Sequence, residues 1–434
     1  MDGDLAPARH TISRFPVEVC ENIIDLLYSV DVKDQVEHSR ALHHCALVCR
    51  AWRVRSQRNL FYSVVLHDLP ALHRFAAVLG NGPHLRDYVH EVTLIGRTLH
   101  TTASPLSVFP VVLHGKLPRL EELTINHVRE DESWYPRTPV VSEIAKPLQY
   151  LPLHPRFPHF LSAFKNVARL FVIKVTFLHL NDFVRIVNAL PALQMLYCHH
   201  VRWRTLGPLP VSTRPNLDEL QLFDVDIHCV QRLVSACGLR LRTLTVSMPF
   251  FHDAEMLHPV NPTTEHTMGI DLSLCSTLDR SYIWLGAEFV SDGKSLDILR
   301  AMLDTWQYVA PLRQIALAAV PQSDFTRQCF ADLLVTVGRV LEDWLRGSPA
   351  PLNADGEDGK QGSGRRRIVV YTYDWEVWQT WWWTHLRGCF PTFAKSGELW
   401  MSYEPPPNDR LKWQDIDTPP PIIPTHVPPT TITI

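Results

Sequence analysis

A short apolar phrase that recurs through the middle of the chain constrains its fold more than any other feature. The phrase places apolar residues at positions 1, 4 and 6, and often again at positions 9 and 11. From Val167 to Leu241 successive copies start 24 to 26 residues apart. A fixed period of this size is typical of repeat proteins, in which each unit buries its apolar side by stacking on the next. Seven copies begin at Val89, Leu120, Val167, Leu193, Leu217, Leu241 and Leu312.

Each copy has the pattern of a short strand followed by a returning helix. In the second copy Leu123 and Ile125 alternate with polar neighbours, as in a strand with one buried face. Residues 180–190 and 226–238 have helical periodicity, and Gly238 is a natural C-terminal cap for the second of these helices. The sequence therefore predicts an α/β solenoid of strand–helix units.

These units resemble leucine-rich repeats in a degenerate form. The family places Asn or Cys after the strand, where the side chain satisfies buried backbone groups, whereas this chain has Val128, Val175, Val201 and Val225. The insertion over 130–160 is rich in proline and aromatic residues and breaks the period. Such an insertion is either a candidate ligand-contacting loop or a tolerated surface loop.

Past residue 250 the phrase fades, and individual elements are predicted from local patterns. We expect a strand over Ile270–Leu274, helices over 295–309 and 325–345, and another strand over 368–373. A helix capped by Asp374 follows, and its Trp375, Trp378 and Trp382 form one stripe. The stripe favours a buried helix that closes the end of the solenoid, with a partner-binding face as the alternative.

The N-terminal segment has a different pattern, that of two amphipathic helices. Pro16 suits the first turn of a helix, because its missing N–H would be unpaired there anyway. The apolar face of the first helix consists of Val19, Ile23 and Leu26/Leu27. The apolar face of the second helix consists of Leu42, Cys45, Val48/Cys49 and Trp52. Two such helices form a small core and expose apolar side chains for a partner.

This segment resembles an F-box, the adaptor-binding module of SCF-type ubiquitin ligases. The matching elements are Phe15-Pro16, Glu18-Val19, Asp31-Val32, Val48-Cys49-Arg50-Ala51-Trp52 and Leu60-Phe61. Phe15 replaces the commoner leucine. Lys33 to Ala41 adds about ten residues before the second helix, and we expect this extra length to form a surface loop.

The resemblance implies a substrate-recruiting F-box protein with degenerate leucine-rich repeats, of the kind found in fungi. Its F-box would bind the small SCF adaptor subunit and, through it, the cullin, while the solenoid holds the protein to be ubiquitinated. Such a chain is not an enzyme and needs no cofactor, because it supplies proximity. The expected adaptor-binding residues, some shared with the core between the helices, are Phe15, Pro16, Val19, Ile23, Leu27, Val48, Cys49, Trp52 and Leu60.

Two alternatives use the same pattern differently. A scaffold for protein assembly without a ubiquitin role would use the helices as an N-terminal cap of the solenoid. A hydrolase or transferase would need a pocket that the sequence does not indicate, since the chain has no Gly-x-Ser-x-Gly and no His-Glu-x-x-His motif. Neither the substrate nor the solenoid face that binds it follows from the sequence.

Composition excludes several other classes of protein. With 46% hydrophobic and 20% charged residues the chain can build a large core, and a net charge of −3 gives no basic field for nucleic acid. No apolar run has the length of a membrane span, and the acidic start lacks the apolar core of a secretory signal. We therefore expect a cytoplasmic or nuclear protein. The predicted division is a tail over 1–13, an F-box over 14–66, a solenoid over 80–403 with a disordered loop near 348–367, and a Pro-rich disordered tail over 404–434.

The nine cysteines are odd in number and form no Cys-x-x-Cys pair, which favours free, reduced thiols. His43, His44, Cys45 and Cys49 are close enough in sequence to suggest a metal site. However, the two cysteines fall on the apolar stripe of the second predicted helix, where cysteine acts as a small hydrophobe. The sequence therefore predicts no metal site.

Overall fold

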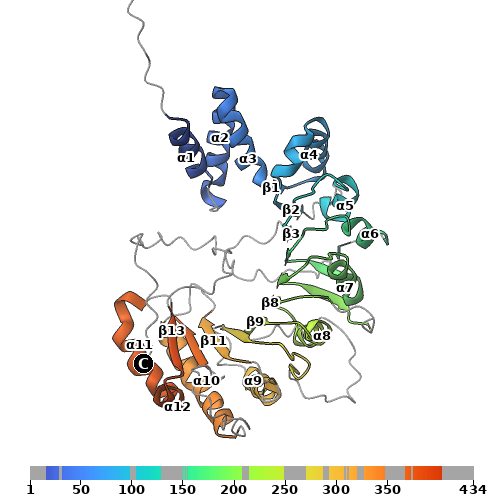
Figure 1. The fold of residues 1–434 in the computed structure, drawn as a ribbon. Coiled ribbons are helices and arrows are strands. Elements are labelled where there is room, and N and C mark those ends of the chain that lie inside the picture. The colour runs from blue at the N-terminus through green and yellow to red at the C-terminus, as the bar shows by residue number, and fades with distance from the viewer. Residues whose placement is uncertain are drawn as a thin grey trace, which may run out of the picture.

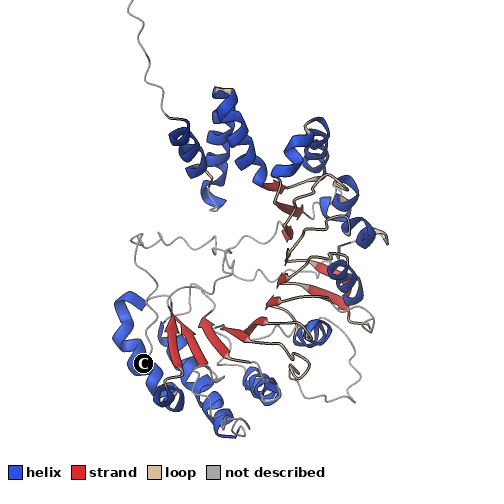
Figure 2. Ribbon diagram, in the orientation of Figure 1, coloured by secondary structure: helices blue, strands red, loops and turns tan. Residues whose placement is uncertain are grey.

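A curved parallel sheet runs through the molecule, with helices along its outer side and three further helices at its N-terminal end (Figures 1 and 2). This arrangement comes from a computed structural model. It describes residues 16–28, 32–97, 104–128, 150–151, 153, 155–207, 215–248, 270–286, 293–306, 309, 312–319, 327–347, 367–372 and 375–402. Phe15, residues 130–149 of the insertion over 130–160 and both predicted tails lie outside these residues.

All neighbouring strands of the main sheet are parallel, and their order follows the chain. Within the described residues it has eleven strands: β1 (Ser63–Leu66), β2 (Glu91–Arg97), β3 (Glu122–Val128), β4 (Arg169–Ile173), β6 (Met195–His199), β8 (Glu219–Phe223), β9 (Thr243–Met248), β10 (Arg280–Leu285), β11 (Gln314–Ala319), β12 (Arg367–Tyr371) and β13 (Leu399–Ser402). A second pair, β5 (Thr176–His179) and β7 (Arg202–Thr205), lies beside it.

The strands are in register with the sequence phrase. Each of the seven copies starts two residues before a strand. Its fourth position forms one continuous row across the sheet, through Val92, Leu123, Leu170, Leu196, Leu220, Leu244, Ser281, Ile315, Ile368 and Leu399. The row is buried under the helices and forms the spine of the core. The repeated phrase therefore forms the strand–helix units of a solenoid-like α/β fold, as predicted.

Helices return the chain between parallel strands, which hairpin turns cannot join. They are α4 (Leu69–Asn81), α5 (Phe109–Val112), α6 (Phe157–Leu161), α7 (Leu180–Asn188), α8 (Ile227–Cys237), α9 (Gly293–Trp306), α10 (Arg327–Gly347), α11 (Trp375–Cys389) and α12 (Pro391–Ser396), with 3-10 helices η1 (Pro83–Tyr88) and η2 (Pro105–Ser107). Asp226 caps α8 by accepting hydrogen bonds from the backbone N–H groups of His228 and Cys229.

One turn recurs at the ends of three successive repeat strands. Lys174, His200 and Asp224 directly follow β4, β6 and β8 with φ of 55°, 51° and 50°. The N–H of Lys174 donates to the carbonyl of His199 at 2.7 Å, and that of His200 to the carbonyl of Phe223 at 3.0 Å. The Asp224 N–H donates instead to Ser247 Oγ at 2.8 Å. Hydrogen bonds to the next repeat therefore satisfy these turns, so buried valines can stand where the family has a polar side chain.

Two details of the solenoid differ from the sequence predictions. Ile270–Leu274 is not a strand; Ile270 and Leu272 are buried in a turn, and the strand in this repeat is β10, whose register is set by pairing with β9. Gly238 follows α8 as predicted but has φ of −57°. A Cβ there would lie 3.0 Å from the Val234 carbonyl oxygen and 3.2 Å from Cys275 Sγ, so close packing favours glycine.

The C-terminal predictions hold with modified ends. The helices expected over 295–309 and 325–345 are α9 and α10, and the strand expected over 368–373 is β12, which starts at Arg367. The tryptophan helix is α11, but its backbone departs from helical geometry at Trp378. Trp382 is fully buried and Trp378 is exposed, so the tryptophans do not form one buried stripe.

The N-terminal segment holds three helices where two are predicted: α1 (Val17–Leu26), α2 (Val32–Val48) and α3 (Arg50–Tyr62). Cys49 is extended, with φ of −159°, and breaks the predicted second helix into two. Lys33–Ala41 is not a loop but the first half of α2, because it contains no proline or glycine to stop a helix.

Candidate functional site

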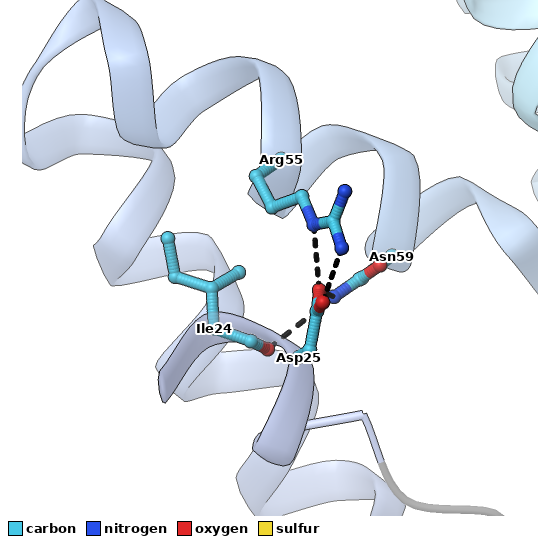
Figure 3. Close-up of polar contacts among 4 residues, drawn as sticks. All are labelled: Ile24, Asp25, Arg55 and Asn59. Atoms are coloured by element: carbon cyan, nitrogen blue, oxygen red, sulfur yellow. Dashed lines mark hydrogen bonds and ion pairs between the residues drawn. The ribbon is translucent and has the colours of Figure 1, made fainter. Parts of the chain in front are cut away.

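Residues 16–62, which we name the N-terminal helical module, are held together by a polar contact between α1 and α3. Arg55 donates two hydrogen bonds to the Asp25 carboxylate, the one from Nε being 2.7 Å long. Asn59 donates to the Ile24 carbonyl at 3.3 Å and to Asp25 Oδ1 at 3.2 Å (Figure 3). The hydrogen bond from Arg55 holds the pKa of Asp25 below its usual value. The end of α1 is thereby fixed to α3 with fully buried Ile24 beside it.

The module is also joined to the first repeat. α3 ends at Tyr62 and β1 begins at the next residue, Ser63. The first strand of the sheet therefore lies within residues 14–66, which the sequence assigned to the F-box. The Tyr62 carbonyl accepts a hydrogen bond from the His90 N–H at 3.0 Å, and the two rings stack at 4.9 Å. Phe61 stacks on Phe75 of α4 at 6.4 Å. These contacts attach the module to the edge of the sheet.

Apolar side chains at the surface are concentrated on this module. Six of the twelve large exposed hydrophobic residues in the described part of the chain belong to it. Three lie on α1 and three at or near the junction of α2 with α3: Val19 (39% exposed), Ile23 (49%), Leu26 (81%), Leu47 (68%), Val48 (63%) and Val54 (59%). Exposed apolar side chains in this number on a small domain are typical of a surface that contacts a partner.

The predicted adaptor-binding residues fall into two groups. Pro16, Val19, Ile23, Val48 and Cys49 are exposed. The expectation that Val48 and Cys49 lie on the buried stripe of one helix is wrong. The helix breaks at Cys49, so the end of α2 and the start of α3 do not continue a single stripe. The half-buried group is Leu27, Trp52 and Leu60, and Phe15 lies outside the described residues.

Sequence reasoning missed three exposed residues of the module: Leu26, Leu47 and Val54. The apolar period does not distinguish Leu26 from its neighbour Leu27, but in the structure Leu26 is 81% exposed and Leu27 is half-buried. Leu47 precedes the Val48–Trp52 phrase, and Val54 follows it. Neither had a signal of its own without the position of the helix break.

The inner face of the sheet has an aromatic centre, which we name the aromatic face: Phe171, Tyr197, Phe223, Tyr282, Trp284, Tyr371 and Trp400. These side chains alternate along the strands with the buried spine and come from six strands. Phe171 and Tyr197 lie 5.4 Å apart, and Tyr197 and Phe223 5.3 Å apart. Burial raises the pKa of the Tyr282 and Tyr371 hydroxyls above the ordinary tyrosine value.

Two histidines and a carboxylate meet beside the aromatic face, at the ends of β6 and β8. His199 Nε2 lies 3.1 Å from Asp224 Oδ2, and His200 Nε2 lies 3.3 Å from the same oxygen. Burial lowers the pKa of His200 to about 4, so that its ring is neutral at pH 7. Burial alone would raise the pKa of Asp224, but the hydrogen bond from His199 and the two imidazoles outweigh it and lower that pKa. We name this group the His–His–Asp cluster.

From the sequence a different set of histidines and cysteines was considered as a metal site and rejected. His43, His44 and Cys49 are exposed on the module, and Cys45 is half-buried. The His–His–Asp cluster was missed because its members belong to two repeats, with Asp224 25 residues after His199 in sequence. All nine cysteines are free, five of them buried.

Among the helices in the described part of the chain, none combines the length and apolarity that crossing a membrane requires. No family model and no curated protein matches the chain. Among solved structures, a leucine-rich-repeat protein of Leptospira interrogans is similar at 11% identity, over 73% of this chain and 74% of that one. The TM-score is 0.21. The solenoid assignment therefore rests on the repeat phrase and on the parallel sheet that it forms.

Proposed function

We propose that this chain is a substrate-recruiting subunit of an SCF-type ubiquitin ligase. Its N-terminal helical module would bind the small adaptor subunit, and its solenoid would hold the target protein. The observation that carries the proposal is the concentration of exposed apolar side chains on the module. A helical module with such a surface, joined to a solenoid, fits the F-box pattern in the sequence.

The exposed residues identify the surface that would contact the adaptor. Val48 and Cys49 lie where α2 gives way to α3, within the Val48–Trp52 phrase, and Ile23 lies on α1. The Asp25–Arg55 contact fixes α1 on α3, so both exposed groups are presented from one rigid unit. Burial of such side chains at a protein interface supplies the affinity.

Binding of the intact chain to the purified small SCF adaptor, measured by biolayer interferometry, tests the proposal. We expect Ile23→Asp combined with Val48→Asp to weaken binding by about 30-fold or more, because a buried charge replaces an apolar contact. Both residues are exposed, so the fold should survive. Val111→Asp with Leu239→Asp is the matched control, since these exposed apolar residues lie on the solenoid.

A second pair of variants follows from the sequence pattern. Pro16→Ala with Trp52→Ala should also abolish adaptor binding while the circular dichroism of the solenoid persists. If the wild-type chain fails to bind under conditions in which another F-box protein binds, the ubiquitin role is wrong and the scaffold alternative gains. If the chain binds but the Ile23 and Val48 variant binds equally well, the proposed interface is wrong.

A further inference from the structure

We propose that the His–His–Asp cluster is a binding site for a divalent transition-metal ion, with His199 Nε2, His200 Nε2 and an Asp224 carboxylate oxygen as ligands. Nothing in the adaptor role requires this site, and it lies on the solenoid, away from the helical module (Figure 1). Each of the three residues offers one ligand atom within 4.8 Å of those of the other two.

The spacing of the ligand atoms fits a tetrahedral ion. With bonds of about 2.0–2.1 Å to imidazole nitrogen and carboxylate oxygen, neighbouring ligands of a tetrahedral zinc lie about 3.3 Å apart. The two nitrogen–oxygen distances here are 3.1 and 3.3 Å. An ion can therefore enter between the three atoms with small side-chain movements. Each imidazole then carries its proton on Nδ1 and offers the Nε2 lone pair.

The repeat architecture brings the ligands together. His199 is the last residue of β6, and His200 and Asp224 occupy the same turn position in two adjacent repeats. Lys174 occupies that position in the preceding repeat and also has a positive φ. The positive φ is therefore a feature of the repeated turn and does not depend on ligand binding. The backbone bond from His200 to the Phe223 carbonyl and the bond from the Asp224 N–H to Ser247 Oγ, 2.8 Å long, hold the two turns in register.

The chemistry of the cluster selects the class of ion. Calcium and magnesium need several oxygen ligands, and only one carboxylate is present in the cluster. Lys174 and Arg202 place positive charge near the cluster. This charge weakens the binding of any cation that is held by electrostatic attraction alone. Imidazole-binding ions such as zinc, cobalt, nickel and copper overcome this because they bind nitrogen strongly. Three protein ligands leave a fourth position for water.

The test measures zinc and cobalt binding by the full-length chain after chelation and dialysis. Exposed Cys49 and Cys329 are first blocked with N-ethylmaleimide to remove competing thiolates. We expect one zinc per chain by elemental analysis, and a cobalt complex without the near-ultraviolet band of a thiolate ligand. The variant is His200→Asn with Asp224→Asn, because asparagine tolerates the positive φ at both positions. Its zinc affinity should fall by at least about tenfold.

The matched control is His43→Ala with His44→Ala, an adjacent exposed histidine pair on α2. It should retain the zinc stoichiometry and affinity of the wild-type chain. Circular dichroism of each variant confirms that the solenoid is folded. Failure of the wild-type chain to bind zinc or cobalt, a thiolate band in the cobalt spectrum, or unchanged affinity in the folded His200→Asn, Asp224→Asn variant would overturn the proposal.

Discussion

The helical module and the solenoid carry apolar residues at equally regular spacing but bury them to very different degrees. Leu170, Leu196 and Leu220 of the sheet spine are fully buried, whereas Ile23 and Val48 of the module are about half exposed or more. The difference comes from stacking. Each repeat is covered by its neighbours on both sides, whereas among the described residues the module packs on itself and on the first repeat.

This contrast shows that periodicity identifies the apolar face of an element but not what covers it. In the solenoid the cover is the next copy of the same phrase, so the sequence contains it. On the module the exposed residues have no equivalent cover among the described elements. An apolar face of this kind is where a partner gains binding energy.

Cysteine reactivity should separate exposed positions from the buried core of the solenoid most sharply. Cys49 of the module is exposed, whereas burial raises the pKa of Cys237 and Cys275 in the solenoid to about 12 and of Cys389 to about 11. Since the thiolate is the nucleophile, we expect maleimide to label Cys49 and Cys329 of the native chain orders of magnitude faster than these three. Mass spectrometry of digested, labelled protein at pH 7 and pH 9 measures the rates. Rapid labelling of Cys237 in the native chain would show that the repeat stack opens.

Truncation of the sheet spine should have the next largest effect. Leu220→Ala should lower the free energy of unfolding by about 2–5 kcal/mol, because it leaves a cavity in a fully buried row. Ile23→Ala on the module should change it by no more than about 0.5 kcal/mol. Urea unfolding followed by circular dichroism compares the two. Equal losses would mean that Ile23 is covered in the folded chain.

Two serines of the solenoid should respond to the same substitution with opposite signs. Ser281 stands in the leucine row, fully buried, and its hydroxyl has no hydrogen-bond partner within the described residues. Ser281→Ala should raise the free energy of unfolding by up to about 1 kcal/mol. Ser247→Ala should lower it by about 1 kcal/mol, because the Asp224 N–H loses its acceptor. Thermal unfolding of both variants tests the pair, and a loss of stability in Ser281→Ala would reveal a partner for its hydroxyl.

The Asp25–Arg55 pair should contribute least. Both side chains are about one third exposed, so solvent screens the pair and Arg55→Met should lower the free energy of unfolding by about 1 kcal/mol or less. Because the folded pKa of Asp25 is lowered, this contribution is present above the unfolded value near 3.8 and is lost as the pH falls through the folded pKa.

The comparison of wild type with Asp25→Asn isolates that pH dependence. The difference between their free energies of unfolding should be constant from pH 7 to pH 5 and should shrink on acidification below about pH 4. A difference that persists unchanged at low pH would mean that Asp25 acts through packing and not through its charge.

Prediction from the sequence succeeded where an apolar face and the residues that bury it both belong to the same repeated phrase. Leu123 and Leu196 both lie at the fourth position of the phrase, and the sheet places them in one row, as the period implies. It failed at Ile270–Leu274, where an apolar alternation resembled a strand. There the position of the strand was decided by pairing with β9, which the sequence of the segment does not contain.

The sites divide in the same way. The Val48–Trp52 phrase and the face of α1 pointed to the module as a binding surface, but the break at Cys49 decided which of its side chains are exposed. The His–His–Asp cluster had no sequence signal, because neither the adjacent histidines nor the aspartate is unusual alone. Only stacking of two repeats brings Asp224 to His199.

The sequence by itself determined the repeated strand–helix unit and the helical character of the N-terminal segment, because both depend on periods of apolar residues within a short stretch of chain. The tertiary structure alone decided which apolar residues of the module remain exposed, where α2 ends and α3 begins, and which polar side chains meet across the turns. These outcomes depend on contacts between segments far apart in sequence, and a local pattern does not encode the partner that covers it.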